Sequence, residues 1–392
     1  MGDDYWKPDM LLTSWNQADS GKIPVSGAGY RGRFHGPGFD SIWTDMSEIV
    51  RPTRDGIHGR EYISTSVDIG PKPMHLSFAP DGKMLTRPLN LLELQIPAVL
   101  DVPAWPMRQA GLGMARAMAA KELMTIALLY AQDTAELPQD LLPFVVPILD
   151  GKSSCNSINF AETAYKMVQL MDGPDTFEMA DIIRAANPLK IISVRMILKP
   201  DTADRIVEMS QRGFKVFHLC ADLHGCELSE NGEGRHIKDV LREIHSRLVK
   251  EGIRDEITLI VSGGIALAEH MAKAIICGAD LVGVDTALLV ALGCRVCRNA
   301  HTLNIESGTQ DVNTPIDACP VKIESADVTY AAHRMTNLMG AWHNQLIEVL
   351  GAMGIREVRR LRGEMGRAIF MEEIEKEAFG DLLHVPQEEE VA

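Results

Sequence analysis

The sequence is poor in positive charge. It has 39 Lys and Arg against 54 Asp and Glu, which gives a formal net charge of −15 and a pI of about 5.3. A net charge of this sign repels a phosphate backbone unless a local basic surface overcomes it. The densest basic run, Arg356–Arg367, is interleaved with leucine, methionine and glutamate, as is typical of the solvated face of a helix. We therefore expect no nucleic-acid partner.

Long apolar runs are also missing. An apolar stretch such as Met114–Ala131 is interrupted by Arg116, Lys121 and Glu122 and is unsuited to cross a bilayer. The first residues are acidic and aromatic, whereas a secretory signal begins basic and continues apolar. We therefore expect a cytoplasmic protein with no membrane span.

Neither a disulfide framework nor a dinucleotide fingerprint is present. The 7 cysteines are odd in number and irregularly spaced, which in a reducing compartment favours metal ligation or buried thiols. No predicted strand is followed by a G-x-G-x-x-G motif, so NAD(P)H would have to be oxidised on another protein.

What the sequence does contain, from Leu94 onward, is an alternation of short apolar and amphipathic segments. This pattern is typical of repeated strand–helix units around a parallel sheet. The predicted strands are Ala98–Val102, Thr125–Tyr130, Phe144–Leu149, Lys190–Ile197, Lys215–Leu219, Thr258–Val261 and Ala279–Val284, with an eighth expected between Asp150 and Pro188. The predicted helices are Gly113–Leu123, Phe160–Met171, Ala203–Gln211, Ile237–Lys250 and Ala266–Cys277. The fold class is therefore α/β, a (β/α)8 TIM barrel, which needs about 250 residues.

The rest of the chain is expected to flank this barrel. The N-terminal part shows no sustained period and is predicted to be irregular, with short strands near Glu61–Ile69 and Met74–Ala79. Two helices, Asp327–Met353 and Ile355–Ala378, are predicted near the C-terminus. We divide the chain into an N-terminal extension (1–90), the barrel (91–292), a cysteine-bearing loop (293–325) and C-terminal helices with a tail (326–392).

Two neighbouring predicted strands end in small residues. Without a Cβ, backbone amides can come within hydrogen-bonding distance of an anion, and in barrels the loops after the seventh and eighth strands form the usual phosphate site. The sequence therefore predicts a phosphate site, with a simple tight turn at Gly263–Gly264 as the alternative. Its predicted residues are Ser262, Gly263, Gly264, Gly283, Val284, Asp285 and Thr286.

Several segments carry a resemblance to a known family. They are Val261-Ser-Gly-Gly-Ile265, Gly278-Ala-Asp280, Thr286–Cys294, Cys319-Pro-Val and Leu346–Val358. Over residues 190–380 the chain resembles the FMN-binding domain of the glutamate synthase large subunit family. The resemblance implies an FMN-dependent oxidoreductase barrel whose flavin exchanges electrons with a nearby iron–sulfur cluster.

Candidate catalytic residues follow from the same resemblance and from the strand ends. Arg195 stands where the family has a lysine beside the flavin, so the resemblance implies that it stabilises negative charge on the reduced flavin. A structural ion pair at the barrel mouth is the alternative. Asp222 and His224 follow a predicted strand and are candidates to relay a proton, with structural hydrogen bonding as the alternative.

Three cysteines are the candidate cluster ligands. Cys294 and Cys297 are separated by two residues, and Cys319 precedes a proline as in the family's Cys-Pro-Val. Thiolates are soft ligands for iron, and three of them suit a 3Fe-4S cluster, or a 4Fe-4S cluster with an outside fourth ligand. The alternative is one core cysteine and two loop thiols.

The sequence departs from the family in several places. Asp285 replaces a small residue, and an ionised carboxylate there would repel a phosphate. Cys220–Cys226 replaces the glycine-rich substrate loop, so the 2-oxoglutarate site does not carry over. An insertion separates Cys319 from the other two cysteines, and the family's N-terminal glutaminase cysteine is missing.

We therefore expect a flavin-dependent electron-transfer oxidoreductase with a small-molecule substrate. It would be a subunit of an oligomer or larger redox complex in which a partner supplies electrons, and it would lack its own glutaminase and NAD(P)H sites. One alternative is a cofactor-poor barrel that acts as a scaffold or regulatory subunit. Another is a nucleotide-converting barrel related to inosine monophosphate dehydrogenase, with Cys226 as the nucleophile.

Overall fold

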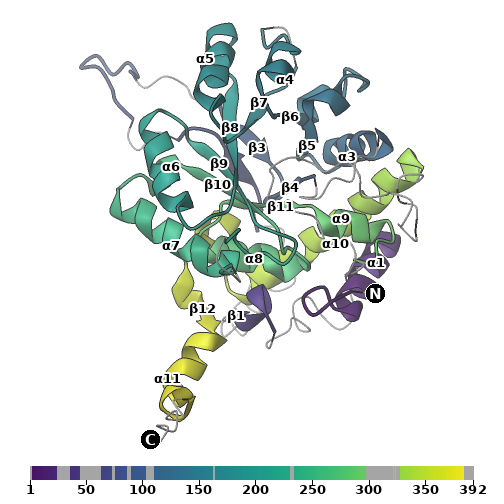
Figure 1. The fold of residues 1–392 in the computed structure, drawn as a ribbon. Helices are drawn as coiled ribbons and strands as arrows, with labels where there is room; N and C mark the ends of the chain where they lie inside the picture. Colours follow the sequence, from purple (N-terminus) through teal and green to yellow (C-terminus); the bar gives the residue numbers. More distant parts are fainter. Residues whose placement is uncertain are drawn as a thin grey trace, which may run out of the picture.

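A closed barrel of eight parallel strands forms the centre of the molecule (Figure 1). This confirms the predicted (β/α)8 class. The computed structural model describes residues 2–23, 36–44, 63–72, 76–85, 90–102, 110–161, 164–229, 234–296, 321, 323 and 327–383. The barrel strands, in order around the barrel, are β4 (Ala98–Leu100), β5 (Ala127–Tyr130), β6 (Val145–Leu149), β7 (Met167–Met171), β8 (Ile191–Ile197), β9 (Val216–Cys220), β10 (Thr258–Ser262) and β11 (Leu281–Val284).

The strands are mostly apolar because both of their faces are covered. Every residue of β6, β9 and β10 is buried. The register pairs Ser262 at the end of β10 with Gly283 on β11 and with Cys220 on β9. The carboxyl ends of these three strands therefore meet at one rim of the barrel, which we call the mouth.

Helices surround the barrel and complete its outer layer. They are α3 (Ala110–Glu122), α4 (Lys152–Asn156), α5 (Thr176–Ala186), α6 (Thr202–Gln211), α7 (Ile237–Lys250), α8 (Ala268–Cys277), α9 (Thr286–Ala291) and α10 (Val328–Ala352). In α7 the buried Ile237, Val240, Leu241, Ile244 and Leu248 recur at three- and four-residue spacing, so one face packs on the sheet. The long α10 contacts both α8 and α3, and so it fills the position between the last and first units of the ring.

One predicted helix is a strand. Phe160–Met171 was expected to be helical, but Met167–Met171 forms β7 and pairs with both β6 and β8. This is the eighth strand that the sequence pattern left unplaced. A short, fully buried apolar segment has no periodicity that separates strand from helix. The helix of this unit, α5, comes later in the chain.

The N-terminal extension is more regular than predicted. Helix α1 (Pro8–Ser20) starts with a proline, whose fixed φ suits a first turn, and ends at Gly21 in the left-handed conformation. It packs on α9 and α10. The expected strand near Glu61–Ile69 is confirmed at its end, because β2 (Val67–Ile69) pairs with β3 (Leu92–Leu94). Of Met74–Ala79, the first two residues lie outside the described residues, and Phe78 forms a single bridge to Met84.

The second predicted C-terminal helix is wrong over its first two thirds. Instead of a helix over Ile355–Ala378, the chain forms two 3-10 turns, Val358–Leu361 and Met365–Arg367. Strand β12 (Ala368–Phe370) then pairs antiparallel with β1 (Ile42–Thr44), and α11 (Met371–Leu383) extends away from the barrel (Figure 1). Gly363, at a φ of 73°, breaks the helical pattern between the two turns. The remaining 3-10 turns are Gly38–Ser41, Ala131–Thr134, Leu142–Phe144 and Arg254–Glu256.

Trp342 joins the N-terminal helix to the barrel layer, and this contact gives a test of the fold. Trp342 on α10 is fully buried, and its Nε1 donates to Gln17 Oε1 on α1 at 3.0 Å. We expect Trp342→Phe to lower the free energy of unfolding by about 2 kcal/mol, because it leaves a void and an unsatisfied buried amide oxygen. Urea denaturation measures the change. Trp15→Phe is the matched control, since Trp15 also lies on α1 but is 43% exposed.

Candidate active site at the barrel mouth

A buried ion pair lies at the centre of the mouth. Asp101 directly follows β4, and Arg195 points inward from β8 on the opposite side of the barrel. The guanidinium donates twice, from Nη1 to Asp101 Oδ1 at 2.9 Å and from Nη2 to Oδ2 at 3.2 Å. Both residues are buried, and this bidentate geometry is the strongest form of such a pair. The structural ion pair that was the alternative for Arg195 is therefore present.

A chain of hydrogen bonds extends from this ion pair. Gln169 Nε2 donates to His218 Nδ1 at 3.1 Å, and Arg195 Nη1 lies 3.2 Å from the same nitrogen. Because both neighbours of Nδ1 are donors, the ring proton belongs on Nε2. That nitrogen donates to Ser262 Oγ at 2.6 Å, and Ser262 donates to Asp101 Oδ2 at 2.7 Å. The network thus runs from β7 through β9 and β10 to β4.

Burial and the ion pair fix the charges of this network. Burial lowers the pKa of His218 to about 3, although Asp101 opposes the shift, so the imidazole is neutral at physiological pH. Burial alone would raise the pKa of Asp101, but Arg195 and His218 outweigh it and the pKa is lowered. The carboxylate is therefore ionised and the guanidinium protonated, and the pair carries no net charge.

Cys220 adds a thiol to this region without making it a metal site. Asp101, His218 and Cys220 have ligand atoms within 4.8 Å of one another. Burial raises the pKa of the Cys220 thiol to about 12, so the thiol is protonated. The Asp101 carboxylate already forms an ion pair with Arg195. A cation there would have to displace the guanidinium and a proton.

The predicted phosphate residues come together at the tips of β10 and β11. Gly263 and Gly264 have φ angles of 99° and 68°, so the backbone turns back at this point. Among the described residues, their main-chain amides donate no hydrogen bond. The Thr286 hydroxyl at the neighbouring tip is buried and also has no partner there. Unsatisfied buried donors of this kind are rare and call for an acceptor.

The glycines are also required by contacts within the chain. A Cβ on Gly264 would lie 2.7 Å from the Tyr5 hydroxyl and 2.8 Å from the Gly225 nitrogen. The Tyr5 hydroxyl donates to the Gly264 carbonyl at 2.6 Å, so the N-terminal segment covers the glycine pair from outside. A Cβ on Gly283 would lie 2.0 Å from Ser262 Oγ, so this glycine makes room for the polar network. The Val284 carbonyl accepts from the Asp101 amide at 2.8 Å.

Asp285 introduces an acidic group beside these donors. Its carboxylate accepts a hydrogen bond from the Thr286 amide and is buried. Burial, with the negative charge of Asp101, raises the pKa of Asp285 to about 6. Asp285 therefore competes with an anion for the Thr286 amide. Above this pH its carboxylate is ionised, and its negative charge opposes anion binding.

Asp222 and His224 meet different partners. Asp222 Oδ1 accepts from the amides of His224 at 2.9 Å and Cys226 at 2.7 Å, which shapes the loop after β9. His224 Nε2 lies 2.9 Å from Asp3 Oδ2, and its side chain is 38% exposed. Each side chain thus has a hydrogen-bond partner of its own, and their role in proton transfer stays a prediction.

The cluster cysteines lie at the edge of what the structure describes. Cys294 is half-buried just after α9, and its amide donates to the Leu289 carbonyl at 3.0 Å. Cys297 and Cys319 lie outside the described residues. Their grouping with Cys294 therefore stays a prediction.

Two residues of the site carry little sequence signal. Tyr5 is far from the barrel in sequence, and no local pattern places it over Gly264. Gln169 was hidden inside the segment that was predicted to be helical, although a lone amide within an apolar run is a usable sign of a buried polar contact.

Comparisons with known proteins show a similarity to glutamate synthases. Residues 228–356 match a family described as the conserved region in glutamate synthase. The archaeal glutamate synthase (NADPH) of Methanocaldococcus jannaschii is 26% identical, over 96% of this chain and 84% of that protein. The archaeal-type glutamate synthase (NADPH) of Thermotoga neapolitana is 25% identical, over 96% of this chain and 83% of its own. This chain is glutamate synthase-like.

The fold is shared more widely than the sequence. A mutant flavocytochrome b2 with pyruvate bound superposes with a TM-score of 0.51 at 10% identity, covering 98% of this chain and 99% of that one. This likeness extends to the barrel architecture alone. In the part of the chain that the structure describes, no helix combines the length and apolarity needed to cross a membrane.

The raised pKa of Asp285 gives a pH-dependent test. Its folded pKa of about 6 lies above the ordinary 3.8, so the contribution of this group to stability is complete at low pH and is lost as the pH rises through 6. Asp285→Asn keeps an oxygen for the Thr286 amide and removes the charge. We expect it to raise the free energy of unfolding by about 2 kcal/mol at high pH and to have no such effect near pH 4.

Asp280→Asn is the control, because its expected change in stability has the opposite sign. Burial would raise the pKa of Asp280, but Arg254, Lys72 and Arg362 outweigh it and lower the pKa to about 2. This variant should lose stability at neutral pH. Denaturation curves recorded across the pH range measure both variants. An Asp285→Asn effect that is independent of pH would contradict the electrostatic account.

Proposed function

We propose that the protein is an FMN-dependent oxidoreductase of the glutamate synthase type. The observation that carries the proposal is the set of unsatisfied donors at two adjacent strand tips. These are the main-chain amides of Gly263 and Gly264 and the buried hydroxyl of Thr286. Donors of this kind, after the seventh and eighth strands of a barrel, suit a phosphate. The relatives are glutamate synthases that use NADPH, which supports the redox class.

The donor set fits the phosphate of FMN, with one group opposed to it. Gly263 and Gly264 would supply amides and Thr286 its hydroxyl. The ionised carboxylate of Asp285 opposes the phosphate, whereas its protonated form does not, and its pKa is raised to about 6 by burial. We therefore expect the affinity for FMN to rise as the pH falls through this value.

The polar network of the mouth has a defined role in this proposal. Bound FMN would supply the redox centre that accepts and donates electrons. Arg195 would present a buried guanidinium to developing negative charge, with Asp101 holding it in place and offsetting its net charge. His218 Nε2 donates to Ser262, which donates to Asp101, so these groups hold the carboxylate that orients Arg195.

Tyr5 and its neighbours would exclude water from the same end of the barrel. The Tyr5 hydroxyl is bonded to Gly264, and Trp6 Nε1 donates to the Leu223 carbonyl at 2.9 Å. The N-terminal segment thus lies across the loops that follow β9 and β10. Exclusion of water strengthens every charge interaction beneath it.

The proposal also includes a partner subunit and an iron–sulfur cluster. We propose that a partner subunit supplies electrons, and that Cys294, Cys297 and Cys319 hold a 3Fe-4S or 4Fe-4S cluster that receives or passes them on. The spacing of the cysteines supports this role, since thiolates are the usual ligands of such clusters. The candidate roles of Asp222 and His224 in proton transfer are weakened by their separate hydrogen bonds.

Two observations favour a second candidate, a cofactor-poor scaffold. Asp285 already accepts the hydrogen bond of the Thr286 amide, and Tyr5 already lies against Gly264. If the mouth were permanently closed in this way, the barrel would serve as an assembly surface. The two candidates differ in whether the purified protein retains flavin.

Thr286→Val tests the phosphate site with little change of shape. The hydroxyl lacks a partner among the described residues, so its removal should raise the free energy of unfolding of the flavin-free protein by about 1 kcal/mol. The same change should weaken FMN binding about tenfold, because a charge-assisted hydrogen bond is lost. Fluorescence titration with FMN measures the second effect.

The matched control is Thr125→Val. Thr125 is also buried, but its hydroxyl donates to the Ala98 carbonyl at 2.5 Å near the other end of the barrel. This variant should lose stability and leave FMN binding unchanged. An unchanged FMN affinity in Thr286→Val would remove Thr286 from the site.

The visible spectrum and iron content separate the two candidate functions. Protein purified without oxygen from a host supplied with iron and flavin should show the two visible bands of a flavin and a broad thiolate-to-iron absorption. Cys297→Ser should lose iron and keep flavin. A colourless wild-type protein without iron would contradict the oxidoreductase and favour the scaffold.

A further inference from the structure

A charged cavity lies at the amino ends of the strands, away from the mouth. It has a volume of about 220 Å³ and is formed where β2, the residues just before β10 and β11, and the turn Val358–Leu361 meet. Its charged walls are Asp68, Lys72, Asp255, Asp280, Arg359 and Arg362. The polar network of the mouth shares no residue with it.

The carboxylates of this cavity are already occupied by guanidinium groups. Asp280 Oδ2 accepts from Arg254 Nη2 at 2.9 Å, and its Oδ1 accepts from Arg362 Nη1 at the same distance. Arg359 Nη1 lies 3.1 Å from Asp68 Oδ2. Asp255, which accepts from Arg362 at 2.6 Å, is 79% exposed, so water screens much of its charge.

Lys72 is the cation of this cavity that has no carboxylate within hydrogen-bonding distance among the described residues. Its side chain is 25% exposed, and the carboxylate oxygen recorded nearest to its Nζ is Asp280 Oδ1 at 3.9 Å. Among the described residues this ammonium donates no hydrogen bond. Burial lowers the pKa of Lys72, and although Asp280 opposes the shift, Arg362 adds to it. A half-buried ammonium of this kind is stabilised by any acceptor that enters the cavity.

We infer that this cavity binds a small oxyanion of the phosphate class, with Lys72 as its main donor and Arg359 and Arg362 at its sides. Arginine forks and a lysine point charge together match a tetrahedral oxyanion. The volume is below the range of about 300 to 1,000 Å³ that is usual for larger ligands. In a chain whose net charge is −15, this cavity still brings one lysine and two arginines to its walls.

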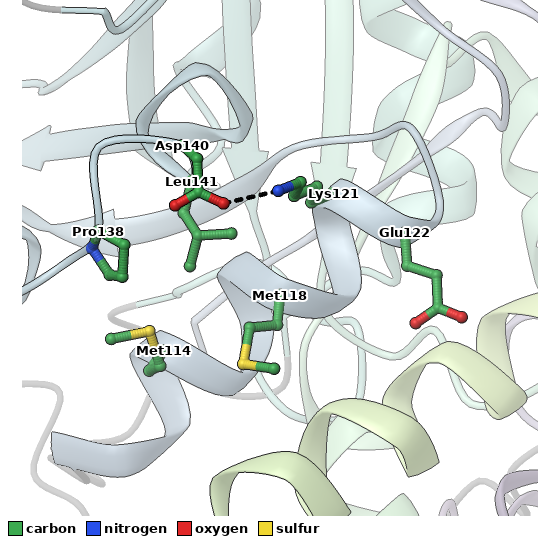
Figure 2. A pocket seen from close by; sticks show the side chains of 7 residues that line it. All are labelled: Met114, Met118, Lys121, Glu122, Pro138, Asp140 and Leu141. Carbon is green, nitrogen blue, oxygen red and sulfur yellow. Dashed lines mark hydrogen bonds and ion pairs between the residues drawn. The ribbon is translucent and has the colours of Figure 1, made fainter.

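Another cavity, on the barrel exterior, contains a lysine whose ammonium already has an acceptor. It has a volume of about 520 Å³ and lies between α3 and the loop at Pro138–Leu141, with Met114 and Met118 along its floor (Figure 2). Its lysine, Lys121, donates to Asp140 at 2.6 Å, as the dashed line in Figure 2 marks. Because that ammonium already has an acceptor, Lys121 is the matched control for Lys72.

The experiment is a calorimetric titration of the full-length, flavin-saturated protein with inorganic phosphate. Sodium chloride at matched ionic strength is the reference, and glycerol phosphate is a second arm that separates a free phosphate from an esterified one. We expect saturable binding to the wild type. Lys72→Gln should weaken it about tenfold or more, whereas Lys72→Arg should retain it within about threefold.

One further variant assigns the binding to this cavity. Lys121→Gln should bind phosphate as the wild type does. Phosphate binding that is not saturable, that chloride reproduces, or that is unchanged in Lys72→Gln would overturn the inference.

Discussion

The ion pair between Asp101 and Arg195 is the interaction on which the mouth depends. It crosses the barrel from β4 to β8, and both partners are buried. Removing either partner of such a pair leaves an uncompensated buried charge, which is strongly destabilising. His218, Ser262 and Gln169 all bond to this pair directly or through one neighbour, so the pair anchors their side chains.

The same constraint explains why the tips of β10 and β11 combine unsatisfied donors with a carboxylate. Gly283 has no side chain because a Cβ would meet Ser262, which the network requires. Asp285 is turned toward Thr286 instead of toward Arg195, and its carboxyl is left with a raised pKa. If the mouth binds FMN as proposed, protonation of this buried carboxyl favours the anion. Natural barrels place such strained charges where function needs them.

The sequence predicted the barrel well and the site in part, for physical reasons. Ile237–Lys250 was predicted with its observed bounds because one apolar face of a solvent-exposed helix leaves a clear period. β7 was missed because a strand that is buried on both faces has no period to read. The meeting of Gly263, Gly264 and Thr286 at adjacent strand tips was predicted from local sequence. The place of Tyr5 over Gly264 was not, because it is set by tertiary packing across more than half of the chain.

The central claim is that the strand tips recognise a phosphate group, and a comparison of two flavins tests it most directly. FMN and riboflavin share the ring system and differ only in the phosphate. Fluorescence titration of the flavin-free protein at pH 6 should give an affinity for FMN roughly a hundredfold above that for riboflavin, the contribution of two or more charge-assisted hydrogen bonds. Equal affinities for the two flavins, or binding of neither, would contradict the account.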